Sequence, residues 1–157
     1  MIRTATLTGS YKQIPFFKGL DDSHLSKLEA LGHELTFDRD QIICREGDES
    51  SFFYIILSGR VSLEVTALGR TLRVQTIGEN EEFGWSSMLP SHGKQFQARA
   101  LDSLHVLAFD GPRLREACEE DNTFGYALMK RLLSVVSHRL LAMRVQVLDM
   151  YSPGVKG

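Results

Sequence analysis

Between residues 33 and 109 the chain consists of short apolar runs separated by glycines, and this pattern constrains the fold more than any other feature. The runs cover residues 52–57, 61–65, 71–77, 96–100 and 104–109, and the glycines near them are Gly47, Gly59, Gly69 and Gly78. In one run Val61, Leu63 and Val65 are apolar. Ser62 and Glu64 alternate with them and are expected to point outward, as on a strand with one buried face. Short strands joined by tight turns predict an antiparallel sandwich or jelly roll, mostly β with flanking helices.

Helical periodicity replaces the strand pattern on both sides of this region. Before it, Asp21 or Asp22 can cap a short helix that Gly32 ends. After it, Asp110 followed closely by Pro112 is a typical helix start, because proline is tolerated in the first turn. The length predicts one domain over residues 1–157. Its expected parts are a helical start at 10–32, a β-roll at 33–109 and C-terminal helices at 110–151.

The last helix is expected from about Asp121 or Asn122 to Tyr151 and carries two apolar rows. The first row has steps of four and three residues and comprises Leu128, Leu132, Val136, Leu140, Met143, Val147 and Met150. The second comprises Leu133, Leu141 and Leu148. We assign the first row to the same helix of a second subunit, and the second row to the barrel. The alternative is a single-sided amphipathic helix that lies on the barrel of a monomer.

Several segments resemble the cyclic-nucleotide-binding domains of the catabolite activator (Crp/Fnr) family. They are residues 45–48 followed after six residues by 55–61, the segment 17–20 with Leu25 and Leu28, and the segments 78–79, 83–84 and 98–100. The resemblance runs from about residue 12 to residue 150. It implies a double-stranded β-helix (jelly roll) with an N-terminal helix and a long C-terminal dimerisation helix. It also implies a sensor of small molecules.

The resemblance is weaker in the segment that binds the ligand's phosphate, the cassette. Nucleotide-binding members of the family have a glutamate that accepts from the ribose hydroxyl and an arginine that meets the cyclic phosphate. Trp85 stands in the place of the glutamate, and Lys94, followed by Gln95, stands in the place of the arginine. A hydrogen bond to a charged group contributes about 1.5–3 kcal/mol. Loss of both contacts would weaken cyclic AMP binding by about two to four orders of magnitude.

The remaining residues can still form a cradle for an anion. Serines after a glycine can offer free amides and hydroxyls to an acidic group. The candidate ligand-binding residues are Gly84, Trp85, Ser86, Ser87, Lys94 and Gln95. The ligand would be a cyclic nucleotide or another small acidic molecule. Two alternatives stay open: Trp85 either stacks on a ligand or plugs an empty pocket, and Lys94 is either a ligand contact or a solvated loop lysine. Nearby Glu79, Glu81 and Glu82 would repel a phosphate if they pointed inward.

Other function classes lack their residues. The sequence has no His-x-His pair or Cys-x-x-Cys pair for a metal, and no serine elbow or glycine-rich phosphate loop. An enzyme is therefore not expected, and Cys44 and Cys118 are interpreted as small buried hydrophobes. A net charge of −2 argues against a nucleic-acid surface. The expected absence of a helix-turn-helix domain after Tyr151 argues against direct DNA binding.

Two functions remain after these exclusions. The first is a cytoplasmic homodimeric sensor of a small molecule, since the sequence has no long apolar run for a membrane span or signal peptide. The second is a degenerate domain of the same fold that binds no ligand and serves as a dimeric interaction module, with a protein partner still to be identified.

Overall fold

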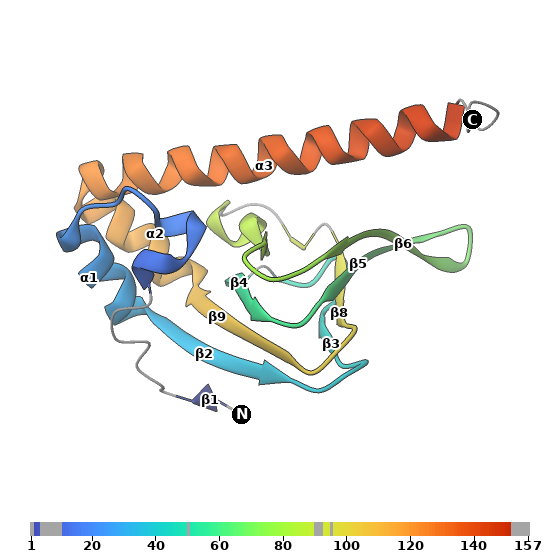
Figure 1. Cartoon of the computed structure of the whole chain (residues 1–157), viewed down its shortest axis with the longest axis horizontal. Helices are drawn as coiled ribbons and strands as arrows, with labels where there is room; N and C mark the ends of the chain where they lie inside the picture. The colour runs from blue at the N-terminus through green and yellow to red at the C-terminus, as the bar shows by residue number, and fades with distance from the viewer. Residues whose placement is uncertain (1, 4–10, 50, 90–92, 95, 152–157) are drawn as a thin grey trace.

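A computed structural model describes residues 2–3, 11–49, 51–89, 93–94 and 96–151 (Figure 1). Within these residues the strands form two antiparallel sheets. The first has the order β1 (Ile2–Arg3), β2 (Gly32–Phe37), β9 (Leu104–Asp110), β4 (Phe52–Ser58) and β7 (Glu82–Phe83). The second has the order β3 (Ile42–Cys44), β8 (Gln97–Ala100), β5 (Val61–Ala67) and β6 (Arg70–Ile77). The predicted jelly roll is therefore confirmed.

Strand β2 was not among the strands that the sequence pattern predicted, and its residues explain why. Strand β2 begins at Gly32, whose backbone amide also donates a hydrogen bond to the carbonyl oxygen of Leu28 and so closes the last turn of the preceding helix. Its apolar alternation is masked because Glu34 is buried in the middle of the strand. The Glu34 carboxylate lies 3.3 Å from His105 Nε2, so the buried side chain has a polar partner on β9.

Gly59 makes the turn between β4 and β5 possible. Its φ is +96°, a left-handed conformation that side chains rarely adopt. A Cβ at this position would also lie 2.7 Å from the carbonyl oxygen of Ser103. The turn therefore requires glycine for two separate reasons.

The prediction that Ser62 and Glu64 face solvent is wrong. Both side chains are buried, because neighbouring strands cover that face of β5 with long polar side chains. Gln97 Nε2 donates to Glu64 Oε1 at 2.9 Å, and Ser62 Oγ donates to Glu64 Oε2 at 2.9 Å. Arg73 Nε donates to Ser62 Oγ at 3.0 Å. The alternation that marks the strand is real, but the polar face is satisfied by hydrogen bonds within the protein rather than by water.

Helices flank the two sheets, and the expected caps are present. Asp21 Oδ1 accepts from the amide of His24 at 2.9 Å, and Asp110 Oδ1 accepts from the amide of Arg113 at 3.0 Å. These carboxylates satisfy amides that have no partner in the first helical turn. The helical segments at the two ends of the β-region are η1 (Tyr11–Gln13), η2 (Pro15–Phe17), α1 (Asp22–Leu31), α2 (Gly111–Glu120) and α3 (Asn122–Tyr151), and the short η3 (Trp85–Met88) follows β7.

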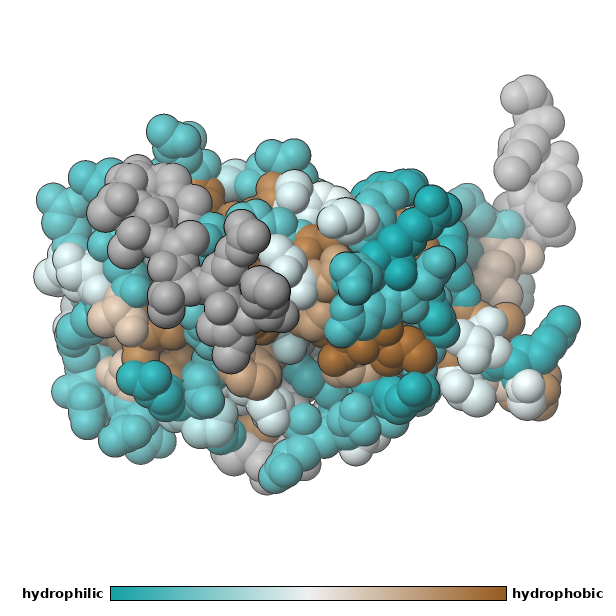
Figure 2. Space-filling model, turned by 90° about the horizontal axis from the view of Figure 1, so that it is seen from below, coloured by the Kyte–Doolittle hydropathy of each residue, from teal (hydrophilic) through white to brown (hydrophobic). Residues whose placement is uncertain are grey.

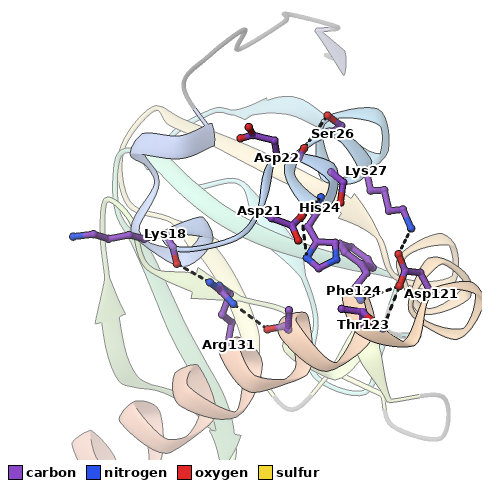
Figure 3. A network of polar contacts seen from close by, with 12 residues as sticks. Lys18, Asp21, Asp22, His24, Ser26, Lys27, Asp121, Thr123, Phe124 and Arg131 are labelled. Atoms are coloured by element: carbon purple, nitrogen blue, oxygen red, sulfur yellow. Dashed lines mark hydrogen bonds and ion pairs between the residues drawn. The ribbon is translucent and has the colours of Figure 1, made fainter.

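Polar contacts fix the first half of α3 against the N-terminal helices (Figure 3). Asp121 caps α3 by accepting from the amide of Phe124 at 3.2 Å, and Lys27 of α1 forms an ion pair with the same carboxylate. About two turns after Phe124, Arg131 donates to the carbonyl oxygen of Lys18 at 2.6 Å. The second half of α3 continues across the sheets toward the β5–β6 hairpin (Figure 1).

The assignment of the two apolar rows of α3 is partly wrong. The face toward the barrel carries the buried residues Phe124, Leu128, Leu132, Val135 and Arg139. Leu133, Leu141 and Leu148, which we had assigned to the barrel, are 70%, 55% and 56% exposed. The reason is rotation: each step of four residues turns about 40° beyond a full circle. Three such steps carry the first row from the barrel face at Leu128 to the outer face at Leu140.

The buried apolar residues form two clusters that meet near residue 84. One lies between the sheets and includes Ile56, Phe83 and Val106. The other lies under the helices and includes Phe17, and Trp85 packs against its edge. The face turned away from α3 is hydrophilic over most of its area, with separate apolar areas (Figure 2). The segment around residue 84 thus joins the two parts of the core.

Candidate functional site

A small cavity lies where the segment after β7 meets the second sheet and α3. Its lining residues are Cys44, Leu63, Phe83, Gly84, Trp85, Ser86, Lys94, Phe96, Ala98 and Arg139. Four of the six residues predicted from the sequence are therefore brought together here: Gly84, Trp85, Ser86 and Lys94. The cavity volume is about 30 Å³. Pockets for small ligands typically measure about 300–1,000 Å³, so this cavity is much smaller than a typical ligand pocket.

Gly84 lets the backbone approach the site closely. Its φ is +79°, and it stands immediately before the short 3-10 helix η3 (Trp85–Met88). A Cβ at this position would lie 2.5 Å from the carbonyl oxygen of Phe52 and 3.0 Å from Lys94 Nζ. The glycine therefore allows β4, η3 and Lys94 to meet at one point.

The residues after Gly84 point in different directions. Trp85 is half-buried and forms one wall of the cavity, and Ser86 is buried beside it. Ser87 is fully buried on another side, where its Cβ packs against Gly111 at the start of α2. Its hydroxyl has no hydrogen-bond partner within the described part of the chain, and Ser87 is not among the described residues that line the cavity. Gln95 lies outside the residues that the structure describes.

Lys94 is buried, so the alternative of a solvated loop lysine is wrong. The side chain is only 7% exposed, and its ammonium donates to the carbonyl oxygen of Phe52 at 2.8 Å. The ammonium also lies 5.8 Å from the ring centroid of Tyr54. Burial lowers the pKa of Lys94, and the neighbouring Cys44 and Asp48 oppose this shift. The site therefore holds a desolvated cation.

Backbone contacts fix the position of Lys94. Its amide donates to the carbonyl oxygen of Asp48, and its carbonyl oxygen accepts from the amide of Gly47, both at 2.9 Å. Asp48 Oδ2 in turn accepts from the amide of Arg45 at 2.9 Å, which closes the turn at 45–48. The conspicuous turn in the sequence thus has a direct role in placing the cation.

Arg139 of α3 is a site residue that the sequence reasoning missed. It is 8% exposed and lines the same cavity as Lys94. Its guanidinium donates to Gln75 Oε1 at 3.3 Å and to the carbonyl oxygen of Glu82. Burial lowers the pKa of Arg139, and Glu81 and Glu82 oppose the shift. A signal was available, since Arg139 is the one charge on the barrel-facing row of α3.

Glu82 lies at the junction between strand β7 and helix α3. Burial raises the pKa of its carboxyl to about 7; the charge of Arg139 opposes this shift and that of Glu81 adds to it. A second cavity of about 300 Å³ lies beside it, between β6, β7 and α3. Of the three acidic residues that could repel an anion, Glu81 and Glu82 line this outer cavity and Glu79 is exposed. Of the described residues that line the inner cavity, none is acidic.

The described residues offer no other chemistry of this kind. No group of three or more His, Cys, Asp or Glu residues among them could hold a metal ion. None of the described helices is both long enough and apolar enough to cross a bilayer. What the cavity offers is two buried cations in an apolar wall.

Two antiparallel sheets, a short helix after a left-handed glycine and a long helix over the cavity define a class of jelly-roll domains with a small, cation-lined cavity. The chain belongs to the cyclic nucleotide-binding domain family, whose sequence model matches residues 34–121. Domains of this family are regulatory and have no catalytic activity.

Known relatives extend the match on both sides of these residues. The chain is 29% identical over 124 residues, or 79% of its length, to a cAMP-dependent protein kinase regulatory subunit of Candida albicans. It is 27% identical over 144 residues, or 90% of its length, to potassium channel KAT1 of Oryza sativa. The matches cover only 26% and 19% of those two relatives. In its fold the chain resembles a protein of Geobacter metallireducens that was proposed to bind cyclic nucleotides, with a TM-score of 0.75 and 26% identity. That match covers 83% of this chain and 95% of the other.

Proposed function

We propose that the chain is a ligand-sensing regulatory module of the cytoplasm that binds a small anionic molecule in the inner cavity. One observation carries the proposal: Lys94 and Arg139, each more than nine-tenths buried, line one cavity whose described lining includes no carboxylate. Buried cations are rare in proteins unless an opposite charge pairs with them. An anionic ligand would supply that charge. Two unpaired cysteines, Cys44 and Cys118, are in keeping with a reducing compartment.

A cyclic nucleotide is the first ligand to test, because the family binds such ligands. Its phosphate would meet Lys94, and its sugar would approach the position of Trp85. The present cavity of about 30 Å³ requires Trp85 to move before a nucleotide enters. Another small acidic molecule with a planar body would also require Trp85 to move, but over a shorter distance.

We further infer that two copies pair through the outer face of α3. Two sets of residues spaced seven apart form a continuous a/d seam on this face. They are Tyr126, Leu133, Leu140 and Val147, and Met129, Val136, Met143 and Met150. Six of these eight side chains are 41–78% exposed in the monomer. A stripe of this size is rarely left exposed to water, and a second copy of α3 would bury it. Movement of α3 upon ligand binding would then be transmitted to the dimer.

A second function is favoured by the same small volume. If Trp85, which packs on the edge of the helical core cluster, fills the site permanently, the chain is a dimeric interaction domain without a ligand. Both functions use the seam on α3, so the oligomeric state does not separate them. Ligand binding does.

Thermal unfolding in the presence of cyclic mononucleotides and dinucleotides tests the proposed function. A ligand present at 100 times its Kd stabilises the folded state by about 2.7 kcal/mol. We expect a rise in Tm with at least one of these anions and none with the neutral nucleoside adenosine. A flat response to every anion would favour the interaction domain.

A further inference from the structure

Arg139 forms the wall between two cavities. It lines the inner cavity of about 30 Å³ together with Lys94 and Trp85. It also lines the outer cavity of about 300 Å³ together with Gln75 and Glu82. The outer cavity is already at the lower end of the volumes of ligand pockets. The side chain of Arg139 therefore lies between a very small cavity and a larger one.

The two acceptors that hold the guanidinium are neutral. They are the side-chain oxygen of Gln75 on β6 and the backbone carbonyl oxygen of Glu82 on β7. A guanidinium carries five N–H donors in a planar fork that matches a carboxylate or phosphate with two parallel bonds. Exchange of two neutral acceptors for one charged, two-pronged acceptor strengthens the bonds of the guanidinium. The geometry thus favours replacement of these acceptors by an anion.

We propose that Arg139 supplies the two-pronged anion contact that the cassette lacks, with the anion of the ligand taking the place of Gln75 and the Glu82 carbonyl as its acceptor. This inference rests on the proposed function and assigns the ligand a chemical class. The ligand carries one compact oxyanion, a phosphate diester or a carboxylate, on a planar apolar body. Lys94 adds a point charge to the anion, and Trp85 and Phe96 provide the apolar walls.

The position of Arg139 on α3 has a mechanical consequence. Its two hydrogen bonds connect the middle of α3 to β6 and to β7. When the guanidinium turns to the ligand, these bonds are lost and α3 is held through the ligand instead. The Arg139 side chain therefore either holds α3 against β6 and β7 or binds the ligand.

Isothermal titration calorimetry of Arg139 variants tests this inference. The probes are cyclic AMP and cyclic GMP as phosphate diesters, and benzoate as a planar carboxylate. For a probe that binds the wild type, we expect Arg139→Gln to raise the Kd at least about tenfold, since one charge-assisted bond typically contributes that much. Arg139→Lys keeps the positive charge but loses the planar two-pronged donor. Its Kd should therefore lie between those of the wild type and Arg139→Gln. It also serves as the second variant if Arg139→Gln fails to fold. Arg144→Gln, an exposed arginine of the same helix, should bind like the wild type.

Gln75→Ala distinguishes a ligand contact from a merely structural role. If Arg139 binds the ligand, Gln75 competes for the guanidinium, and its removal should leave the Kd unchanged or lower it. If Arg139 only holds α3 in place, Gln75→Ala should weaken binding as Arg139→Gln does, which would overturn the inference. A Kd of Arg139→Gln within twofold of the wild type would also overturn it, while the proposed function would stand. A wild type that binds none of the probes would contradict the proposed function itself, and this inference with it.

Discussion

The ammonium of Lys94 lies 2.8 Å from the carbonyl oxygen of Phe52, although the two residues are 42 positions apart in the chain. This contact joins the loop before β8 to the start of β4, and Gly84 lies against both partners. It places a desolvated cation at the one point where the strands and the short helix η3 meet. The stability of the site and its proposed affinity for anions therefore depend on the same few atoms.

Substitution of Gly84 should be costly. Gly84→Ala introduces a Cβ 2.5 Å from the Phe52 carbonyl oxygen at a φ of +79°. We expect a loss of about 2–4 kcal/mol in the free energy of unfolding, from the left-handed backbone and from the clash with a backbone atom. Gly69→Ala is the matched control, because its φ is +74° and nothing lies within 4 Å of the added Cβ. It should cost only about 1 kcal/mol. Urea unfolding measures both, and equal losses would contradict the close approach at Gly84.

The raised pKa of Glu82 predicts a pH dependence of stability. The folded-state pKa is about 7 and the ordinary value is 4.5, so between these values the folded state binds more protons than the unfolded state. The contribution of Glu82 to the stability of the folded state is fully present below pH 4.5 and is lost as the pH rises through about 7. The full shift corresponds to about 3 kcal/mol, and solvent screening reduces it to about 1–2 kcal/mol.

Glu82→Gln should remove this part of the pH dependence. Urea unfolding of wild type and variant at pH 5, 6, 7 and 8 gives the comparison. We expect the wild type to lose stability relative to the variant across this range. Parallel curves would show that the carboxyl of Glu82 titrates normally.

The seam on α3 predicts a dimer that one pair of charges can dissociate. Leu140→Glu with Met143→Lys places charges at adjacent a and d positions, each opposite its own copy. Because a buried Leu or Met contributes about 1.5–3 kcal/mol and occurs twice, the dimer Kd should rise at least about a hundredfold. The barrel should remain folded, since Leu128, Leu132 and Val135 hold α3 against it.

Sedimentation at micromolar concentration measures the effect on the dimer, with Arg144→Gln as the control on the same helix. The control should sediment as the wild type does. A wild type that is monomeric at these concentrations would contradict the pairing of α3.

Much of the fold could be predicted from the sequence, because strand alternation, glycine turns and helix caps are local signals. The long helix was predicted from about Asp121 or Asn122 to about Tyr151, and the structure has it at Asn122–Tyr151. Which of its faces meets the barrel was not fully predictable, since apolar residues lie on both. The site was harder still. Gly84 and Lys94 follow from the family pattern, whereas Arg139 comes from another element, 45 residues after Lys94. Only the packing of α3 brings it to the cavity.

Restoring the cassette should restore nucleotide affinity. Trp85→Glu with Lys94→Arg returns the glutamate and the arginine that the family resemblance places at these positions. We expect the double variant to bind cyclic AMP at least tenfold more tightly than the wild type, since each contact contributes about 1.5–3 kcal/mol. Calorimetry on both proteins measures this. No gain in affinity would mean that the segment at 84–94 meets a ligand differently from the family pattern.

The most direct test of the central claim uses Trp85, which is the single tryptophan of the chain and forms a wall of the inner cavity. Its fluorescence reports on a wall of that cavity, so the wild type and Lys94→Met are titrated with cyclic AMP, cyclic GMP and benzoate. Removal of the buried ammonium takes away a charge that the anion needs while it keeps the apolar volume. If the cavity binds a small anion, the wild type gives a saturable change with at least one probe, and Lys94→Met requires at least about tenfold more of it. An unchanged Trp85 signal with every probe, or the same Kd in both proteins, would contradict the account.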